Sequence, residues 1–228
     1  MAEFVYTGTK NLEVMEEARN YNAFLLRALT RHLSGVNKVL DFGAGTGLFA
    51  TQIARLGYDL TCVELDAENR RRLSTAGLSA CAGLSSIADE SIDFAYSLNV
   101  LEHIEDDSGA LRSLRTKLRP RGVLFIYVPA FEVLFTNLDR NVGHVRRYRR
   151  HELVARVEAA SFRVREANYV DCLGFIAALL YKLLRRDGVL TVRSVIAYDR
   201  VVFPLSQIMD SLFRRAFGKN IMLIAERI

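Results

Sequence analysis

Short apolar runs alternate along the chain with stretches in which apolar residues recur at helical spacing. The short runs predict strands at 38–42, 60–65, 78–82, 92–98 and 123–128. The helical spacing between them predicts helices at 45–56, 67–76 and 107–118. A run such as VLFIYV, residues 123–128, is apolar throughout, which is typical of strands covered on both faces.

This alternation predicts a doubly wound α/β fold around a central, mostly parallel sheet. After the run at 123–128, a polar loop reaches about Arg150, and a helix at 151–160 and a strand near 163–170 follow. The final NIMLIAERI, residues 220–228, predicts a strand that returns to the sheet. A length of 228 residues favours a single domain, 1–228.

Two helical regions lie outside this core pattern. Apolar spacing predicts one helix over 12–33, within an N-terminal helical segment of residues 1–35. Residues 172–219 predict a helical insertion, or cap, before the last strand. Its apolar run of 13 residues is shorter than the roughly 20 that span a bilayer. Its amphipathic part, 194–216, predicts either a core-facing helix or one that rests on anionic lipid.

Charge is distributed unevenly along the chain. Residues 131–228 hold 17 Lys and Arg against 10 Asp and Glu, whereas residues 1–130 hold 14 against 16. The later part therefore favours an acidic partner such as a phosphate or an anionic membrane surface, with solvated helix faces as the alternative. Three cysteines without a CxxC pair, and an N-terminus without a secretory pattern, predict a cytoplasmic protein, with peripheral contact at the inner membrane face as an open option.

The stretch KVLDFGAGTGLF, residues 38–49, carries the main chemical signal. Gly43, Gly45 and Gly47 follow a strand at every second position and lead into a helix. Such a corner aims free backbone amides at a ligand, and glycine lets the ligand approach the backbone. A dinucleotide fingerprint needs its third glycine where Leu48 stands. The spacing therefore argues against an NAD-dependent oxidoreductase.

Glu64 ends the next predicted strand, 21 residues after Gly43. A carboxylate at that point can accept hydrogen bonds from the hydroxyls of a ribose that lies across the glycine corner. The two features together predict a nucleoside site. A tight turn beside an unrelated glutamate is the structural alternative.

The motifs VLDFGAGTG, VELD, SIDFAYSLNVLEHIEDD, LRPRGVLFIYVPA and GHVRRYRRHEL resemble those of class I S-adenosylmethionine-dependent methyltransferases. The likeness covers about 12–170 and the last strand, and the later motifs are most similar to the bacterial group that methylates quinones, glycans and other small molecules. The resemblance implies a seven-stranded Rossmann-like sheet whose last strand is antiparallel. It also implies S-adenosylmethionine as cofactor and a small-molecule, lipid-linked or glycan-linked acceptor.

The resemblance also implies a set of cofactor-binding positions. The methionine part would pass over the glycine corner, the ribose would bind Glu64, and the adenine amino group would meet backbone near Leu84 because no acidic residue stands there. The full set is Asp41, Gly43, Ala44, Gly45, Gly47, Glu64, Leu65, Leu84 and Asn99.

Methyl transfer from a sulfonium requires alignment of the acceptor and, for a hydroxyl or an acidic carbon, a base. His144 and His103 are the candidate bases, and each could instead brace a loop. Asp139, Arg147 and Tyr148 are predicted to bind substrate, since arginine offers paired donors to a phosphate or carboxylate. No metal is expected, because Asn99 stands where some quinone-pathway relatives have a second glutamate.

Two other functions remain as alternatives. A nucleic-acid methyltransferase is suggested by the basic pI, but SLNV after the fourth strand lacks the Pro-Pro-aromatic motif of amino-methylating enzymes, so nucleic acid is not favoured. The other is a non-catalytic cofactor-binding protein at a membrane surface. Cofactor binding without transfer to any acceptor would distinguish it.

Overall fold

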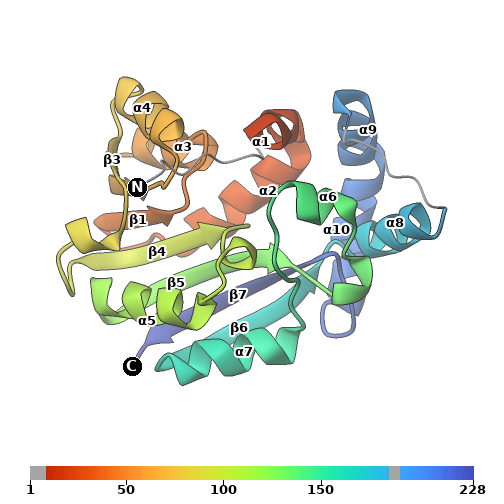
Figure 1. Cartoon of the computed structure of the whole chain (residues 1–228). Coiled ribbons are helices and arrows are strands. Elements are labelled where there is room, and N and C mark those ends of the chain that lie inside the picture. The colour runs from red at the N-terminus through yellow and green to blue at the C-terminus, as the bar shows by residue number, and fades with distance from the viewer. Residues whose placement is uncertain (1–8, 185–190) are drawn as a thin grey trace.

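The computed structural model of the chain describes residues 9–184 and 191–228. Its centre is a seven-stranded sheet in the order β3-β2-β1-β4-β5-β7-β6 (Figure 1). β1 to β5 are parallel, and β7 lies antiparallel between β5 and β6. The strands are β1 Lys38–Phe42, β2 Asp59–Val63, β3 Ser79–Cys81, β4 Ile92–Leu98, β5 Leu118–Pro129, β6 Phe162–Val170 and β7 Asn220–Arg227. The predicted Rossmann-like sheet with an antiparallel last strand is confirmed.

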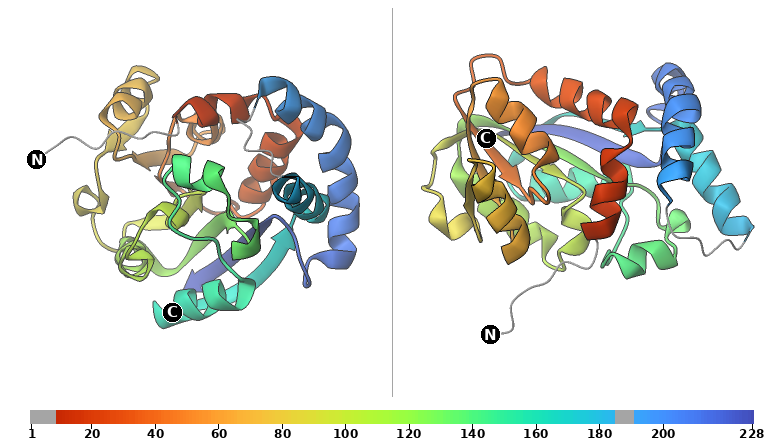
Figure 2. Two further views of the ribbon diagram at one scale, coloured as in Figure 1. Left: turned by 45° about the vertical axis from the view of Figure 1, so that its right-hand side comes forward. Right: turned by 90° about the horizontal axis from the view of Figure 1, so that it is seen from above.

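Helices cover both faces of the sheet (Figures 1 and 2). On one face, α2 (Arg19–Thr30), α3 (Leu48–Arg55) and α4 (Ala67–Thr75) pack on Val39, Phe94 and Phe125. On the other, α5 (Asp107–Lys117) and α7 (Arg150–Ala159) pack on Leu40, Ala95 and Leu124. Successive strand residues thus enter opposite cores, which explains why the strands are apolar at every position. Short 3₁₀ turns connect the layers at η1 (Leu84–Ser86) and η2 (Leu101–His103).

The predicted single helix over 12–33 is wrong, because the structure has two helices there. α1 (Thr9–Glu16) ends before Ala18, whose ψ of 70° leaves the helical region, and α2 then begins. The side-chain amide of Asn22 donates to the carbonyls of Met15 and Glu16, which are free at the end of α1. Apolar spacing continues across this corner and hides it in the sequence. Residues 1–8 of the predicted N-terminal segment lie outside the described residues.

The polar stretch after β5, predicted as a loop, contains two short elements. These are η3 (Glu132–Leu134) and α6 (Asn137–Asn141). The side chains of Thr136 and Asp139 form a capping box around the first turn of α6. The helix is too short for its apolar spacing to be visible, so the loop assignment needs this correction.

The helices of the predicted cap lie between β6 and β7. They are α8 (Cys172–Leu183), α9 (Val192–Ala197), the π-helical turn η4 (Tyr198–Val202) and α10 (Phe203–Phe213). The wider turn of η4 precedes Pro204, which has no N–H to give to a regular helix. None of the helices in the described ranges is both long and apolar enough to cross a bilayer. Residues 185–190 of the cap lie outside the description.

Candidate active site

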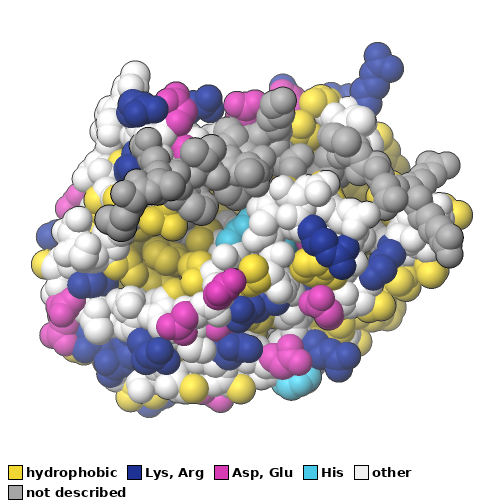
Figure 3. All heavy atoms as spheres, viewed as in Figure 1, with side chains coloured by type: hydrophobic (Ala, Val, Ile, Leu, Met, Phe, Trp, Pro, Cys, Tyr) yellow, Lys and Arg dark blue, Asp and Glu magenta, His cyan; other side chains and the backbone are white. Residues whose placement is uncertain are grey.

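A cavity of about 470 Å³ opens at the carboxyl ends of β1, β2 and β4. The glycine corner forms one wall, and the first two helices and η2 form others. Figure 3 shows the hollow with hydrophobic side chains on its floor. In open α/β sheets, ligands bind in this crevice outside the carboxyl ends of the strands. The cavity is therefore the candidate site.

The glycine corner is held tightly against the neighbouring strand. The backbone N–H groups of Gly43 and Ala44 both donate to the carbonyl of Val63. A Cβ on Gly43, at φ 86°, would lie 2.3 Å from a methyl carbon of Val100, so only glycine fits here. Gly47 is not among the cavity residues. Its Cβ would lie 2.6 Å from Leu73 Cδ2, so it is needed where α3 approaches α4.

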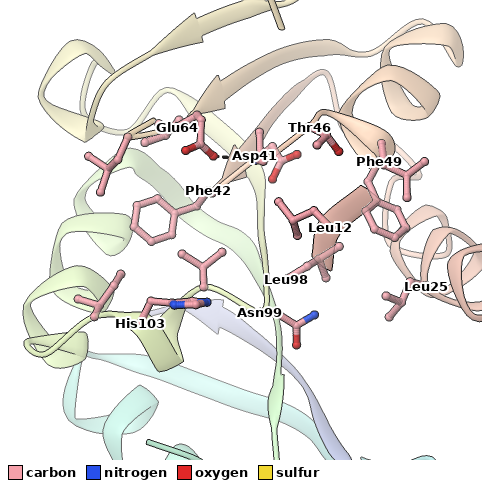
Figure 4. Close-up of a pocket in the computed structure, with 18 of the residues that line it drawn as sticks. Leu12, Leu25, Asp41, Phe42, Thr46, Phe49, Glu64, Leu98, Asn99 and His103 are labelled. Atoms are coloured by element: carbon pink, nitrogen blue, oxygen red, sulfur yellow. Dashed lines mark hydrogen bonds between the residues drawn. The ribbon is translucent and has the colours of Figure 1, made fainter. Parts of the chain in front are cut away.

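Glu64 links the end of β2 to the glycine corner. Its Oε2 accepts a hydrogen bond from the Gly45 N–H at 2.7 Å, and its Oε1 accepts one from the Asp66 N–H at 2.8 Å (Figure 4). A carboxylate can accept about four hydrogen bonds, so these two leave Glu64 able to accept further hydrogen bonds from a ligand in the cavity. Leu65 follows at the cavity edge, with 57% of its side chain exposed.

Asp41 is buried below the glycine corner and accepts a 2.7 Å hydrogen bond from the hydroxyl of Tyr96. Burial raises the pKa of Asp41 to about 7, because the low-dielectric surroundings disfavour its charged form. A cationic ligand group nearby would favour the ionised form. The carboxyl group can therefore respond to a charged ligand.

Asn99 and His103 lie on the side of the cavity opposite Asp41 and Glu64 (Figure 4). Asn99 directly follows β4 with a positive φ of 54°, and its N–H donates to the Tyr127 carbonyl at 2.7 Å. Asparagine tolerates this conformation better than most residues. Leu84, with its neighbours Ala82 and Gly83, forms a wall that carries no carboxylate.

His103 lines the cavity, whereas His144 lies behind it. The two rings meet edge to face with centroids 4.6 Å apart. Burial, together with the nearby His144, lowers the pKa of His103 to about 4, so its imidazole is neutral near pH 7. Nδ1 of His144 lies 2.8 Å from Oδ1 of Asp139. Of the two predicted bases, only His103 reaches the cavity.

The three residues predicted to bind substrate do not line the cavity. Asp139 is 1% exposed, and its carboxylate accepts hydrogen bonds from Arg147 and the Thr136 N–H. Burial would raise the pKa of Asp139, but its bond to His144 and the Arg147 charge outweigh it and lower the pKa to about 2. Tyr148 is 2% exposed and donates to Asp107 at 2.8 Å. In the structure these side chains brace the wall behind His103.

The complete burial of Glu102, beside His103 in the sequence, is the main feature that the sequence did not reveal. Its side chain is fully buried and has no hydrogen-bond partner among the described residues; Nε2 of His144 lies 3.8 Å from its Oε1, and burial raises the pKa of Glu102 to about 8. One ligand atom from each of Glu102, His103 and His144 lies within 4.8 Å of the others, so the composition of the trio suits a cation. The expectation that no metal is bound stays a prediction.

The N-terminal helices also contribute more than the sequence indicated. Leu12 and Met15 of α1, and Tyr21 and Leu25 of α2, line the cavity. Burial raises the pKa of Tyr21 to about 12, so its hydroxyl remains a neutral hydrogen-bonding group. Their apolar spacing was visible in the sequence, but it is equally compatible with core packing.

The family model described as a methyltransferase domain matches residues 14–167, which is more than half of the chain. The chain belongs to this methyltransferase family. The match covers the glycine corner, Glu64 and His103, so it includes the strand ends that line the cavity. S-adenosylmethionine is the cofactor of this family, as the sequence motifs predicted.

Curated relatives agree with this assignment over part of their length. A ubiquinone biosynthesis O-methyltransferase from Methylocella silvestris is 33% identical over 108 residues, 43% of this chain and 42% of the relative. One from Idiomarina loihiensis is 28% identical over 133 residues, 53% of this chain and 51% of the relative. The chain thus spans about half the length, or less, of these relatives.

Solved methyltransferases share the fold. A methyltransferase from Archaeoglobus fulgidus matches with a TM-score of 0.63 at 18% identity, covering 95% of this chain and 99% of that one. Geranyl diphosphate C-methyltransferase from Streptomyces coelicolor matches with a TM-score of 0.65 at 12% identity, covering 90% and 77%. At these identities the likeness concerns the fold alone.

The residues of this methyltransferase fit the family cofactor. Glu64 keeps acceptor capacity beside the glycine corner, where two ribose hydroxyls would need it, and Gly43, Ala44 and Gly45 line the cavity at that corner. Asp41 lines the cavity beneath the same corner, and because burial raises its pKa, a ligand ammonium group there would favour its charged form. Leu65 and Leu84 offer apolar surface for an adenine.

Proposed function

We propose that this chain transfers the methyl group of S-adenosylmethionine to a small, largely apolar acceptor that enters the same cavity. The observation that carries the proposal is the arrangement of this one cavity. Its Glu64 end suits the adenosyl group, and its opposite wall presents His103 and Asn99 (Figure 4). The imidazole of His103, neutral near pH 7, lines the same cavity as Glu64, which supports a shared site for cofactor and acceptor.

The character of the remaining wall supports an apolar acceptor. The space between the two ends is lined by Leu12, Leu25, Phe49 and Leu98. Apolar pockets with a few placed polar groups are typical of small-molecule sites. Two relatives are consistent with this reading: one is named for ubiquinone biosynthesis, and the other was solved with geranyl diphosphate. A quinone precursor or a lipid-linked or glycan-linked molecule is the finer proposal, with the reaction taking place in the cytoplasm.

The bound cofactor supplies a methyl group already activated by its positively charged sulfur. The residues of the chain then have two tasks, to align the acceptor and to take up its proton. His103 is neutral near pH 7 and faces the cavity, so it can accept a proton from an acceptor hydroxyl. His144 lies against it and is held by Asp139, so we assign both to positioning the His103 ring.

The test uses methyl-labelled S-adenosylmethionine with lipid-soluble and water-soluble fractions of a cell extract. We expect label in a product of the lipid-soluble fraction. His103→Gln should lower the rate by about 100-fold or more while cofactor affinity stays unchanged, because general-base catalysis contributes 10²–10⁴-fold. His151→Gln is the matched control, since His151 lies exposed on α7.

Other outcomes would separate the alternatives. A full rate in His103→Gln would remove the proposed base but leave methyl transfer intact. Cofactor binding without label in any fraction would support the non-catalytic membrane-surface protein. Label found only in nucleic acid would overturn the proposed acceptor class.

A further inference from the structure

The helices between β6 and β7 present apolar side chains to the outside. On α10, Leu205, Ile208 and Leu212 are spaced by three and four residues, so they lie on one side of the helix. Ile208 is 72% exposed and Leu212 is 79% exposed, among the most exposed large apolar residues of the described chain. Val201 precedes them by one turn and is also exposed. Such spacing is typical of an amphipathic helix whose apolar side packs against an apolar partner.

α8 carries a second apolar stripe. Ile176, Leu180, Leu183 and Leu184 follow helical spacing and are all exposed. α8 packs on α10, because the Leu173 N–H donates to the Ser206 hydroxyl. Figure 3 shows hydrophobic side chains reaching the surface along the right-hand edge, over α8. We define the apolar face as Ile176, Leu180, Leu183, Leu184, Val201, Leu205, Ile208 and Leu212.

The acidic groups of this region point away from the surface. In the described part of 172–219, the carboxylates are Asp199 and Asp210. Asp199 is 3% exposed and accepts hydrogen bonds from the N–H groups of Asn20 and Tyr21. Asp210 accepts from the N–H groups of Asp171 and Cys172. Both negative charges are therefore used inside the fold.

The basic groups of the same helices point outward. Arg193, Arg200, Arg214 and Arg215 are exposed, and none of them forms an ion pair with another described residue. The apolar face is thus accompanied by positive charge that no carboxylate of these helices neutralises. An amphipathic helix that lies in a membrane interface combines these two properties, since its apolar side enters the acyl boundary and its arginines meet anionic headgroups.

We propose that the apolar face docks on an anionic membrane surface, with α8 and α10 lying in the headgroup region without crossing the bilayer. A second copy of the chain is a poorer occupant. A symmetric contact through this face would bring the same arginines together, and the described part of these helices offers no outward carboxylate to pair with them. An anionic lipid surface satisfies both the apolar and the charged groups.

The docked helices are tied directly to the candidate active site. Asp199 holds the first turn of α2, and Tyr21 and Leu25 of that helix line the cavity. A membrane-docked chain would therefore keep one cavity wall close to the lipid, where a lipid-soluble acceptor is concentrated. This consequence rests on the proposed function, whereas the docking itself does not.

The experiment measures sedimentation of the full chain with vesicles, in the absence of cofactor and acceptor. One set of vesicles contains phosphatidylcholine alone, and the other contains phosphatidylglycerol in addition. We expect binding to the anionic vesicles that decreases with added salt. The double change Ile208→Ser and Leu212→Ser should weaken binding by about 10- to 100-fold, because two buried apolar side chains are lost.

Matched variants separate apolar from charged contributions. Leu56→Ser is the control for the apolar change, since Leu56 is 58% exposed just after α3, at the opposite end of the molecule from α8 (Figure 1). Arg193→Gln and Arg200→Gln should each weaken binding by about fivefold at low salt and less at high salt. Circular dichroism and thermal unfolding confirm that each variant is folded.

Negligible and equal sedimentation with both vesicle types would overturn the proposal. A dimer in lipid-free buffer that Ile208→Ser dissociates would assign the face to a second copy instead. Calorimetry with S-adenosylhomocysteine on the same preparations keeps the two proposals distinct. Vesicle binding without cofactor binding would support the docking and contradict the methyltransferase proposal. Cofactor binding without vesicle binding would contradict the docking and leave the methyltransferase proposal standing.

Discussion

The cavity and the apolar face differ in where their carboxylates point. Those of the cavity line it, whereas those of the helices that carry the apolar face point into the fold. At the cavity, Glu64 accepts hydrogen bonds from two backbone N–H groups and Asp41 accepts one from the Tyr96 hydroxyl, and both residues line the cavity. At the apolar face, Asp199 and Asp210 are consumed by backbone N–H groups inside the fold, while leucines and isoleucines point outward. A buried carboxylate needs partners in both places. In the cavity a bound ligand would supply part of these partners, whereas at Asp199 and Asp210 backbone N–H groups of the chain supply them.

The largest expected difference between the two regions is in cofactor affinity. Glu64→Ala should weaken S-adenosylhomocysteine binding by about 100-fold or more, because two hydrogen bonds to a charged acceptor are lost. Vesicle binding should not change. Calorimetry measures the affinity, and Glu68→Ala on the exposed side of α4 is the control. Unchanged affinity in the Glu64 variant would place the cofactor elsewhere.

Asp199 joins the two regions, so its removal should affect both. Asp199→Ala leaves the Asn20 and Tyr21 N–H groups without an acceptor, and we expect a loss of about 2–4 kcal/mol in the free energy of unfolding. Urea unfolding measures it, with Asp59→Ala at an exposed strand start as the reference. A loss below about 0.5 kcal/mol would show that the carboxylate does not hold α2 to η4.

The free energy of unfolding should depend on pH through Glu102, which is buried in the wall behind the cavity. Burial raises the pKa of Glu102 from 4.5 to about 8, so between these values the folded chain keeps a proton that the unfolded chain releases. The free energy of unfolding should therefore fall as pH rises through this window, by up to about 1.4 kcal/mol per pH unit. Glu102→Gln cannot ionise and should show a shallower decline in urea unfolding. Asp41 is retained in the variant and keeps its own contribution.

Glu105→Gln is the matched control for that measurement, since Glu105 is exposed three residues away. If the free energy of unfolding of wild type and of Glu102→Gln falls in parallel as pH rises, the pKa of Glu102 is not raised in the folded chain. Glu102 would then be ionised there, with its charge stabilised by a neighbouring group.

The smallest effect should come from the apolar face in the absence of lipid. Ile208→Ala should change the free energy of unfolding by no more than about 0.5 kcal/mol, because the side chain is 72% exposed. The same substitution at Ile53, fully buried on α3, should cost about 2–5 kcal/mol. A large loss at Ile208 would mean that its side chain is covered by the protein itself in solution.

The sheet and the meeting of the glycine corner with Glu64 could be predicted from sequence because their signals are local. The glycine spacing after Phe42 and the acid after Val63 each belong to one strand and its turn, and parallel strands bring such ends together at one edge. The break between α1 and α2 was not visible, because Asn22 closes it through contacts with Met15 and Glu16 while apolar spacing continues.

The sequence by itself determined the alternation of strands and helices, the glycine corner and the acidic residue that ends up beside it. Only the tertiary structure decided that His103 faces the cavity while Asp139, His144 and Tyr148 brace it from behind. It also decided that Asp199 and Asp210 turn inward and leave an apolar, basic surface outside. The spacing of apolar residues along a chain specifies which side chains share one face of a helix or strand. What that face packs against depends on elements distant in sequence, and no local pattern encodes their packing.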